Sequence, residues 1–468
     1  MKNFFISDNL KKIKKNNTIS FRRPGHRGYV GMIPEDFFEM DIPSTSYCDP
    51  ATYIRMSQSK VAGIYRSPRS FYLTNGSTSG ICAMISLCTK PGDTIIVDRY
   101  CHRAVIDAII LMGLVPVFLD PVFMHRFGFA GGFSGDALRK VISENPNAKA
   151  VLITSPTTYG IVSDIKNLAS ITHAAGMYLL VDEACGAHFQ FSSHLPAPAI
   201  QLGADFSVQS IYKTLGAMSG SAILHVNTND FLSEDIEDKI SLFTTSNFCV
   251  SNVAVSEIAI YNAAGYSQKY KTLIKELRRA RNCINSNTNA YWLDGEMVNT
   301  CEICDMDITR AVINFSFESF SGYEAQDMLN KNSSIEVEFA DELNIICVFT
   351  PYTKIREVRR FVKELLKITS KKATKEDVSK NITQNVDHDF SMTPQLAFFS
   401  ECETVTLEES IGRTSRNIIT KAPQGIAVII PGEVITPMHI SVINDVLSDG
   451  GRIEGLKEEG KKIDVVAE

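Results

Sequence analysis

The stretch Tyr178-Leu-Leu-Val-Asp182-Glu-Ala184 is a short apolar run that ends in a carboxylate. Continuous apolar runs of this length are typical of strands covered on both faces of a parallel sheet. Runs of the same kind recur along the chain with helix-like segments between them, so the sequence predicts an α/β domain around a largely parallel sheet. We predict strands at 71–73, 94–97, 115–119, 150–154, 178–182, 206–208 and 221–226, and helices at 79–90 and 104–112.

The rest of the chain divides by composition. Residues 1–50 are polar and rich in turn residues, which predicts an N-terminal arm before the large domain at 51–265. A charged helix then opens a smaller α+β domain at 266–368. Polar residues 369–393 predict a linker, and 394–468 form a C-terminal subdomain whose Lys- and Glu-rich end we expect to be frayed.

Composition excludes several classes of protein. The 468 residues include 44% hydrophobic and 21% charged residues, which is ordinary for a soluble globular protein, and the net charge of -6 argues against nucleic acid or anionic membrane as a partner. The start of the chain lacks a signal-peptide core and no apolar run is long enough to span a membrane, so we expect a cytoplasmic protein. Cys301-Glu-Ile-Cys304 has no second pair, and we predict no metal.

A single lysine indicates the chemistry. Lys213 stands in the small, hydroxyl-rich stretch Ser207-Val-Gln-Ser-Ile-Tyr-Lys213-Thr-Leu-Gly-Ala. A lysine amine that is desolvated loses part of its basicity and attacks an aldehyde, forming a Schiff base. Asp182 follows a predicted strand upstream, where ligands bind in open α/β sheets. The pair suggests a site for pyridoxal 5'-phosphate (PLP), although an isolated aspartate is more often a helix cap or ion-pair partner.

The loop Leu73-Thr-Asn-Gly76-Ser77-Thr78-Ser79-Gly80 suits a phosphate group. Gly76 lets the backbone approach an anion, Ser77 and Thr78 offer hydroxyl donors, and the next helix presents free N–H groups. The alternative is that these hydroxyls only cap the helix. Ser210, three residues before Lys213, is also within reach of a phosphate, or makes a local turn.

Two histidines are further candidates. His102 follows a predicted strand, and its flat ring suits stacking on a cofactor. His188 lies just beyond Asp182 and is placed to face a substrate. Each is also compatible with a structural role. Thr244-Thr245-Ser246 is a hydroxyl cluster for which solvent exposure is the default expectation.

Taken in order, these pieces resemble the Orn/Lys/Arg decarboxylase family, PLP enzymes with the fold type I (aspartate-aminotransferase) architecture. The resemblance spans residues 20–435 and matches a compact form without an N-terminal regulator-like domain. It implies a mixed, mostly parallel sheet, smaller α+β C-terminal domains, and a homodimer or higher homo-oligomer with a shared active site. The matching segments are Pro24-Gly-His-Arg-Gly28, Leu73-Thr-Asn-Gly-Ser-Thr78, Cys101-His102-Arg103, Asp182-Glu-Ala-Cys-Gly-Ala-His188, Ser210-Ile-Tyr-Lys213 and Pro423-Gln-Gly-Ile-Ala-Val-Ile-Ile-Pro-Gly-Glu433.

The resemblance also implies roles for individual residues. Lys213 would carry the cofactor, Asp182 would pair with the pyridine nitrogen, and Ala184 and His102 would lie on the two sides of the ring. Gly76, Ser77, Thr78 and Ser210 would hold the phosphate, with Thr244 or Thr245 reaching the phosphate of a neighbouring subunit. Glu433 would lie near the entrance and recognise a basic amino acid, which the enzyme would convert into an amine and CO2.

This chain departs from the family pattern near the substrate. Tyr212 and Cys185 stand where the family usually has histidine, the Tyr-Pro-Pro-Gly-Ile-Pro element is replaced by Lys421-Ala-Pro-Gln-Gly-Ile-Ala427, and Ser44-Thr-Ser-Tyr-Cys-Asp49 replaces a His-Pro element. A positioned acid, either Tyr212 or His188, would return a proton to the substrate carbon. Two alternatives stay open: an aminotransferase or other reaction at the same carbon, and a degenerate family member that acts as a binding or scaffold protein.

Overall fold

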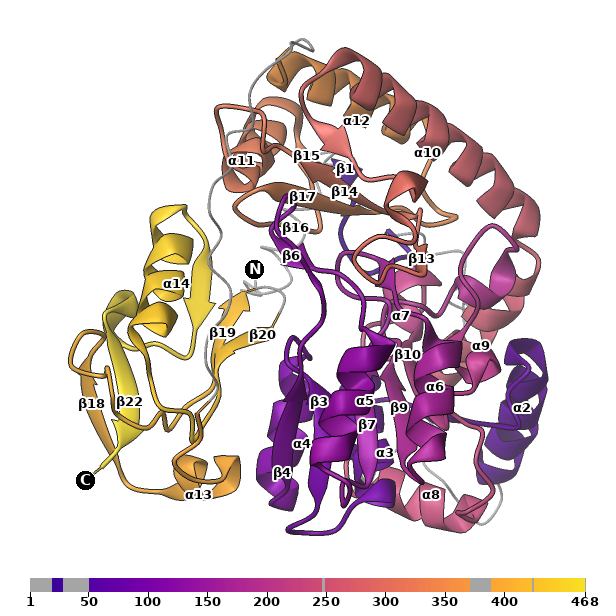
Figure 1. The fold of residues 1–468 in the computed structure, drawn as a ribbon. Coiled ribbons are helices and arrows are strands. Elements are labelled where there is room, and N and C mark those ends of the chain that lie inside the picture. The colour runs from indigo at the N-terminus through magenta and orange to yellow at the C-terminus, as the bar shows by residue number, and fades with distance from the viewer. Residues whose placement is uncertain (1–18, 28–49, 246–248, 371–388, 423–424, 468) are drawn as a thin grey trace, which may run out of the picture.

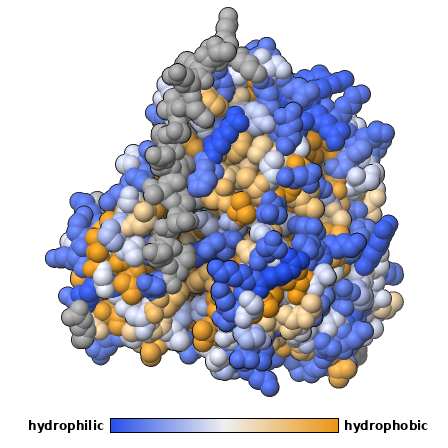
Figure 2. Space-filling view, in the orientation of Figure 1, coloured by the Kyte–Doolittle hydropathy of each residue, from blue (hydrophilic) through white to orange (hydrophobic). Residues whose placement is uncertain are grey.

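The structure is a computed structural model that describes residues 19–27, 50–245, 249–370, 389–422 and 425–467. Three parts of the chain are distinct in Figure 1: a large α/β domain at the lower right, a small domain under two long helices at the top, and a C-terminal subdomain in yellow at the left. In Figure 2 hydrophobic residues form scattered areas between hydrophilic ones, and one such area lies over the C-terminal subdomain.

The large domain is built on a seven-stranded sheet. Six of its strands are parallel, and β11 alone runs antiparallel, between β2 and β10. The fold class predicted from the sequence, a mixed and mostly parallel α/β sheet, is therefore confirmed. In spatial order the strands are β2 (Arg69–Leu73), β11 (Ala222–Val226), β10 (Phe206–Ser210), β9 (Tyr178–Asp182), β7 (Ala150–Thr154), β3 (Thr94–Asp98) and β4 (Val115–Leu119).

Both faces of this sheet are covered by helices. Leu152 of β7 packs into a cluster with α3, α4 and α8, whereas its neighbours Val151 and Ile153 pack against α5 and α6. Gly80 allows close packing on the first face, because a Cβ there would come within 2.6 Å of side chains of β2 and β10. The helices are α2 (Pro50–Tyr65), α3 (Gly76–Cys88), α4 (Arg103–Met112), α5 (Gly135–Glu144), α6 (Ile165–Ala174), α7 (Ile211–Thr214), α8 (Ser233–Ser241) and α9 (Val250–Ala264).

The small domain carries an antiparallel four-stranded sheet with its own apolar core. Two long helices, α10 and α12, pack against each other along it (Figure 1). The strand order is β12 (Tyr291–Trp292), β14 (Arg310–Asn314), β17 (Asn344–Val348) and β16 (Phe339–Ala340), and the helices are α10 (Ser267–Asn287), α11 (Gly322–Ser333) and α12 (Ile355–Ile368). Helix α9 ends at Ala264 and α10 begins at Ser267. We therefore propose that the large domain ends at residue 265, as the sequence predicts.

Residues 19–27, which we call the N-terminal strap, join the two domains. Strand β1 (Ile19–Ser20) pairs with β15 (Ile335–Glu336), and Phe21 O accepts a hydrogen bond from Val348 N in the small sheet. A few residues on, Gly25 N donates to Tyr212 O at 2.8 Å in the large domain. Glycine is required there, because a Cβ would lie 2.9 Å from Lys213 O. The strap thus connects the small sheet to the turn that carries Lys213.

The C-terminal subdomain has a strand close to the end of the described residues. Strand β22 (Lys462–Val466) pairs antiparallel with β18 (Cys402–Thr406), and Ile463 and Val465 are fully buried. The expected frayed end is therefore wrong, since the alternating apolar residues of β22 complete a core that only the folded subdomain provides. Its other elements are α13 (Pro394–Phe399), β19 (Ile419–Ala422), β20 (Ile426–Ile429), α14 (Pro437–Ser448) and β21 (Arg452–Glu454).

Some expectations concern residues beyond this description. Most of the predicted linker and the segment 44–49 lie outside the described residues. Within the described part of the chain, no helix combines the length and the apolar character that crossing a bilayer would need.

Candidate active site

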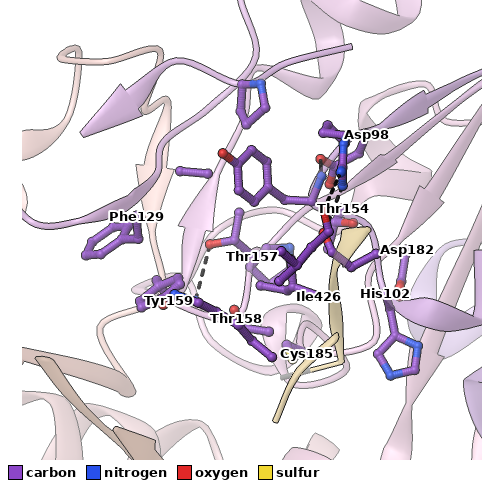
Figure 3. A pocket seen from close by; sticks show the side chains of 18 of the residues that line it. Asp98, His102, Phe129, Thr154, Thr157, Thr158, Tyr159, Asp182, Cys185 and Ile426 are labelled. Atoms are coloured by element: carbon purple, nitrogen blue, oxygen red, sulfur yellow. Dashed lines mark hydrogen bonds between the residues drawn. The ribbon is translucent and has the colours of Figure 1, made fainter. Parts of the chain in front are cut away.

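One cavity of about 1010 Å³ gathers most of the residues that the sequence singled out. Parallel strands end at the same edge of the sheet, and the segments that follow β2, β3, β7, β9 and β10 all line this cavity. Figure 3 shows Asp98, Thr154 and Asp182 close together at this edge, with Ile426 entering from the C-terminal subdomain. We call the part formed by Lys213, Asp182, Ser77 and Thr78 the sheet end of the cavity.

Lys213 lies at the sheet end, in the short helix α7 that follows β10. Its Nζ is 4.0 Å from the Sγ of Cys185. Burial lowers the pKa of Lys213, and nearby Arg23 and Arg310 lower it further, against the opposing effect of Cys185 and Asp182. A lysine with a lowered pKa carries more of the neutral amine that attacks an aldehyde.

Asp182 ends β9 and lines the same cavity with only 3% of its surface exposed. Its Oδ1 accepts a hydrogen bond of 3.0 Å from Ala184 N, which fixes the carboxylate in place. Ala184 and Tyr212 also line the cavity. The structure therefore brings together the amine, the carboxylate and the small residue that the sequence placed there.

The loop after β2 presents donors to the cavity. Gly76 has a φ of +74°, a conformation that favours glycine, and α3 begins at this residue without a side-chain cap from Asn75. Ser77 and Thr78 line the cavity beside the free N–H groups of this helix. The hydroxyl of Ser210 is buried and has no hydrogen-bond partner among the described residues. An uncapped helix N-terminus at the cavity and a buried hydroxyl without a partner each suit a bound phosphate, so these residues are compatible with PLP.

His102 lies on the cavity wall at the start of α4. Its Nδ1 accepts a hydrogen bond of 3.1 Å from Ala104 N, so the other nitrogen, Nε2, is on the opposite side of the ring. A Cβ on Gly425 would approach that Nε2 to 3.3 Å, so the C-terminal subdomain comes near this edge of the ring. The hydrogen bond to Ala104 N orients the ring, while the side chain stays exposed.

Four of the candidates are not among the residues that line the cavity: Ser210, His188, Glu433 and Thr245. His188 is buried behind it, with Nε2 at 2.9 Å from Thr309 Oγ1 and 3.2 Å from Asp307 Oδ2. Glu433 is fully buried, and its carboxylate lies 3.5 Å from Arg99 Nη2 and accepts from Ile430 N. Thr245 is exposed near the end of α8, where Thr244 Oγ1 donates to Ile240 O.

Two residues at the sheet end were not assigned a role from the sequence. Burial disfavours the thiolate of Cys185, but Arg310, Lys213 and Arg23 outweigh it and lower the pKa of this thiol. Asp98 is the last residue of β3, as Asp182 is of β9, and burial raises the pKa of Asp98 to about 7. A carboxylate at the end of a buried strand was the signal that identified Asp182, and it also marks Asp98.

A second part of the cavity, which we call the acidic wall, is formed by Glu342, Asp445, Asp449 and Lys421. Glu342 comes from the small domain and the other residues from the C-terminal subdomain. Beside this wall, the rings of Phe129 and Tyr159 are stacked at 4.1 Å with an angle of 7° between them. No local pattern in the sequence indicates these residues, because distant segments bring them together.

Comparisons with known proteins agree with this geometry. The profile of the family described as Orn/Lys/Arg decarboxylase, major domain, matches residues 6–308. The chain is 28% identical over 461 residues to the arginine decarboxylase of Bacillus subtilis, covering 95% of this chain and 94% of that protein. It is 29% identical over 459 residues to the arginine decarboxylase of Halalkalibacterium halodurans, with coverage of 95% and 94%.

Solved structures show the same fold. The lysine decarboxylase LdcF of Francisella novicida matches with a TM-score of 0.74 at 17% identity, covering 99% of this chain and 84% of that one. The constitutive lysine decarboxylase of E. coli matches with a TM-score of 0.74 at 16% identity, covering 98% and 81%.

Proposed function

Because the chain belongs to the Orn/Lys/Arg decarboxylase family of PLP-dependent decarboxylases, we propose that its substrate is arginine, lysine or ornithine. The products would be the corresponding amine and CO2. Arginine comes first among the three, since relatives that cover nearly the whole chain carry the name arginine decarboxylase.

One observation carries this proposal: Lys213 and Asp182 share a cavity with a wall that bears three carboxylates, Glu342, Asp445 and Asp449. The amine and the carboxylate at the sheet end suit PLP. Carboxylates at a distance from that amine suit a substrate whose side chain ends in a cation. A basic amino acid has both features, an α-amino group for the cofactor and a cationic tail for the wall.

When bound, PLP supplies an electron sink for the pair of electrons left when CO2 departs. Lys213 would hold the cofactor and release it to the amino group of the substrate. Asp182 would keep a proton on the ring nitrogen, because its carboxylate is fixed by Ala184 N. Ser77, Thr78 and Ser210 would hold the phosphate together with the N-terminus of α3, and His102 would cover the ring.

The proton that replaces CO2 needs a donor in the cavity. His188 is separated from the cavity and engaged by Thr309 and Asp307, so Tyr212 is the proposed acid. Burial raises the pKa of Tyr212, while Arg23 opposes this and Cys185 and Glu338 add to it. The phenol is therefore protonated at neutral pH and has a proton to give, and its position in the cavity, not its raised pKa, supports this role.

We also propose that the enzyme acts in the cytoplasm as a homodimer or higher homo-oligomer with a shared site. The exposure of Thr245 at the surface supports contact with a neighbouring subunit's phosphate. Light scattering of the purified protein would give its mass, and a monomer that is fully active would contradict this proposal.

The test of the proposed function is a product analysis. The protein with added PLP is incubated separately with arginine, lysine and ornithine, and CO2 and amine are measured by mass spectrometry. Stoichiometric amine and CO2 from at least one of them is the expected result. A 2-oxo acid would indicate an aminotransferase, and a protein that takes up no PLP would indicate a binding or scaffold role.

A further inference from the structure

An ion pair crosses the acidic wall between two parts of the molecule. The Nζ of Lys421, in β19 of the C-terminal subdomain, lies 3.0 Å from Oε1 of Glu342, in the loop before β17 of the small domain. Both residues line the cavity, and the two side chains are 27% and 14% exposed, respectively. The carboxylate is therefore occupied by an ammonium group within the space that a substrate must enter.

Glu342 and its neighbour Asp341 have different surroundings. Asp341 accepts hydrogen bonds from Leu343 N, from Asn344 N and Nδ2, and from the hydroxyl of Tyr159. Burial, and next the charge of Glu342, raise the pKa of Asp341 to about 6. Asp341 thus holds the loop together, and Glu342 is the carboxylate that the loop directs to the cavity.

The wall around this pair is negative. Asp445 and Asp449 reach it from α14 and the residue after it. The hydroxyl of Tyr323 reports how closely the groups converge: burial raises its pKa, and Glu342, Asp341 and Asp449 raise it further. A single ammonium group, that of Lys421, lies among these carboxylates on the described part of the wall.

An aromatic pair supports the loop that carries Glu342. The stacked rings of Tyr159 and Phe129 lie at the cavity but are only 9% and 2% exposed. The Tyr159 hydroxyl donates to Asp341, the residue before Glu342. This contact helps to fix the position of the Glu342 carboxylate at the cavity.

We propose that Glu342 binds the cationic end of the substrate side chain, and that Lys421 occupies the same carboxylate when no substrate is present. This inference rests on the proposed function. The substrate exchanges one cation for another, so the half-buried carboxylate stays paired in both states. A neutral side chain cannot replace Lys421, which makes the exchange selective for basic amino acids.

The test compares the wild type with Glu342→Gln and Lys421→Met, using arginine and its neutral isostere citrulline. We expect Glu342→Gln to raise KM for arginine about tenfold or more, since a charge-assisted bond is lost, and to reduce the preference for arginine over citrulline. Lys421→Met keeps the length of the stem but removes the competing cation, so KM for arginine should fall. Asp327→Asn removes a carboxylate from an exposed ion pair on α11 and is the matched control.

A second readout does not depend on turnover. Calorimetry of the protein without PLP should show agmatine, the amine formed from arginine, binding more tightly to Lys421→Met and more weakly to Glu342→Gln. If Lys421→Met weakens arginine and agmatine binding, or if Glu342→Gln leaves the arginine preference intact while its melting temperature is normal, the inference is overturned. Failure of the proposed function is a separate result, namely no amine from any basic amino acid with the wild type.

Discussion

The sheet end and the acidic wall of one cavity are built in opposite ways. At the sheet end, Asp182 is the last residue of β9 and Lys213 stands three residues after β10, and these strands are neighbours in one sheet. At the acidic wall, Glu342 and Lys421 are 79 residues apart and belong to different subdomains. The first pair is fixed by the sheet, whereas the second exists only if two separate cores assemble correctly.

We therefore expect the sheet end and the acidic wall to have different functions. Groups that take part in bond breaking need positions that hardly vary, and a buried sheet provides them. Groups that select the side chain of the substrate tolerate substitution better, because they contribute to binding and not to bond breaking. A family can therefore keep one sheet end and vary the opposite wall.

The largest effect is expected from Lys213→Ala, at the sheet end. Lys213 is the lysine at the sheet end, beside Asp182, whereas Lys421 is engaged by Glu342 at the acidic wall. We expect turnover to fall by about 10⁴-fold or more without the Lys213 amine. CO2 release and the visible absorbance of the protein–PLP adduct are the measurements. Lys331→Ala, on the exposed face of α11, is the control and should keep both. Normal turnover in Lys213→Ala would show that Lys213 does not hold the cofactor.

Asp182→Asn should separate chemistry from binding. The amide can still accept from Ala184 N, but it carries no charge to hold the ring nitrogen protonated. We expect kcat to fall by roughly 10²–10³-fold. KM for the basic amino acid should stay nearly constant because the acidic wall is intact. A large rise in KM with unchanged kcat would show that the two regions are not independent.

Ile463→Ala tests the other side of the comparison. Ile463 is fully buried in the core of the C-terminal subdomain, so the cavity left by truncation should cost about 2–4 kcal/mol of the free energy of unfolding. Denaturant unfolding measures this cost. Leu396→Ala, at a residue that is 60% exposed, is the control. We expect the proposed preference for a basic substrate to weaken while PLP absorbance persists. Loss of PLP absorbance with that preference kept would contradict the division between the two regions.

The smallest expected effect concerns the thiol of Cys185. Burial disfavours its thiolate, yet Arg310, Lys213 and Arg23 outweigh burial and lower its pKa, whereas burial raises the pKa of Cys82 to about 11. Because only the thiolate reacts, iodoacetamide should modify Cys185 at lower pH than Cys82, as mass spectrometry of peptides would show. Arg310→Gln should move the reaction of Cys185 to higher pH.

The same thiol contributes to stability with a defined sign. A thiol whose pKa is lower in the folded state than in the unfolded state stabilises the fold. This contribution is complete at pH values above the pKa of the unfolded state. That contribution is lost as the pH falls through the folded pKa. Removing the thiol by Cys185→Ala should therefore weaken the pH dependence of the melting temperature between the folded and the unfolded pKa of this thiol. An unchanged dependence would contradict a lowered pKa for Cys185.

The sequence predicted the sheet end because its residues follow recognisable strands. Strands at 150–154 and 178–182 coincide with β7 and β9, and the carboxylate after the second lies in the cavity. Lys213, Ser77 and Thr78 were found by the same reasoning, since each stands in a short segment with its own pattern. Local chemistry and sheet topology agree at this end of the cavity.

Elsewhere the sequence was a poor guide. Glu433 suggested a substrate contact but is buried against Arg99 in this chain, while Glu342 carried no local signal. The final segment looked too charged for a strand, yet Ile463 and Val465 alternate with polar residues and pair with β18. Such contacts depend on partners far away in sequence, and no window of neighbouring residues contains them.

The N-terminal strap has a mechanical consequence. It is bonded to the small sheet through Phe21 O, to the segment after β17 through Gly25 O and Thr350 Oγ1, and to the large domain through Gly25 N and Tyr212 O. A rotation of the small sheet therefore pulls on the peptide group immediately before Lys213. Tilting one domain against the other would therefore change the position of the Lys213 amine, and the stiffness of this nine-residue strap would limit such a movement.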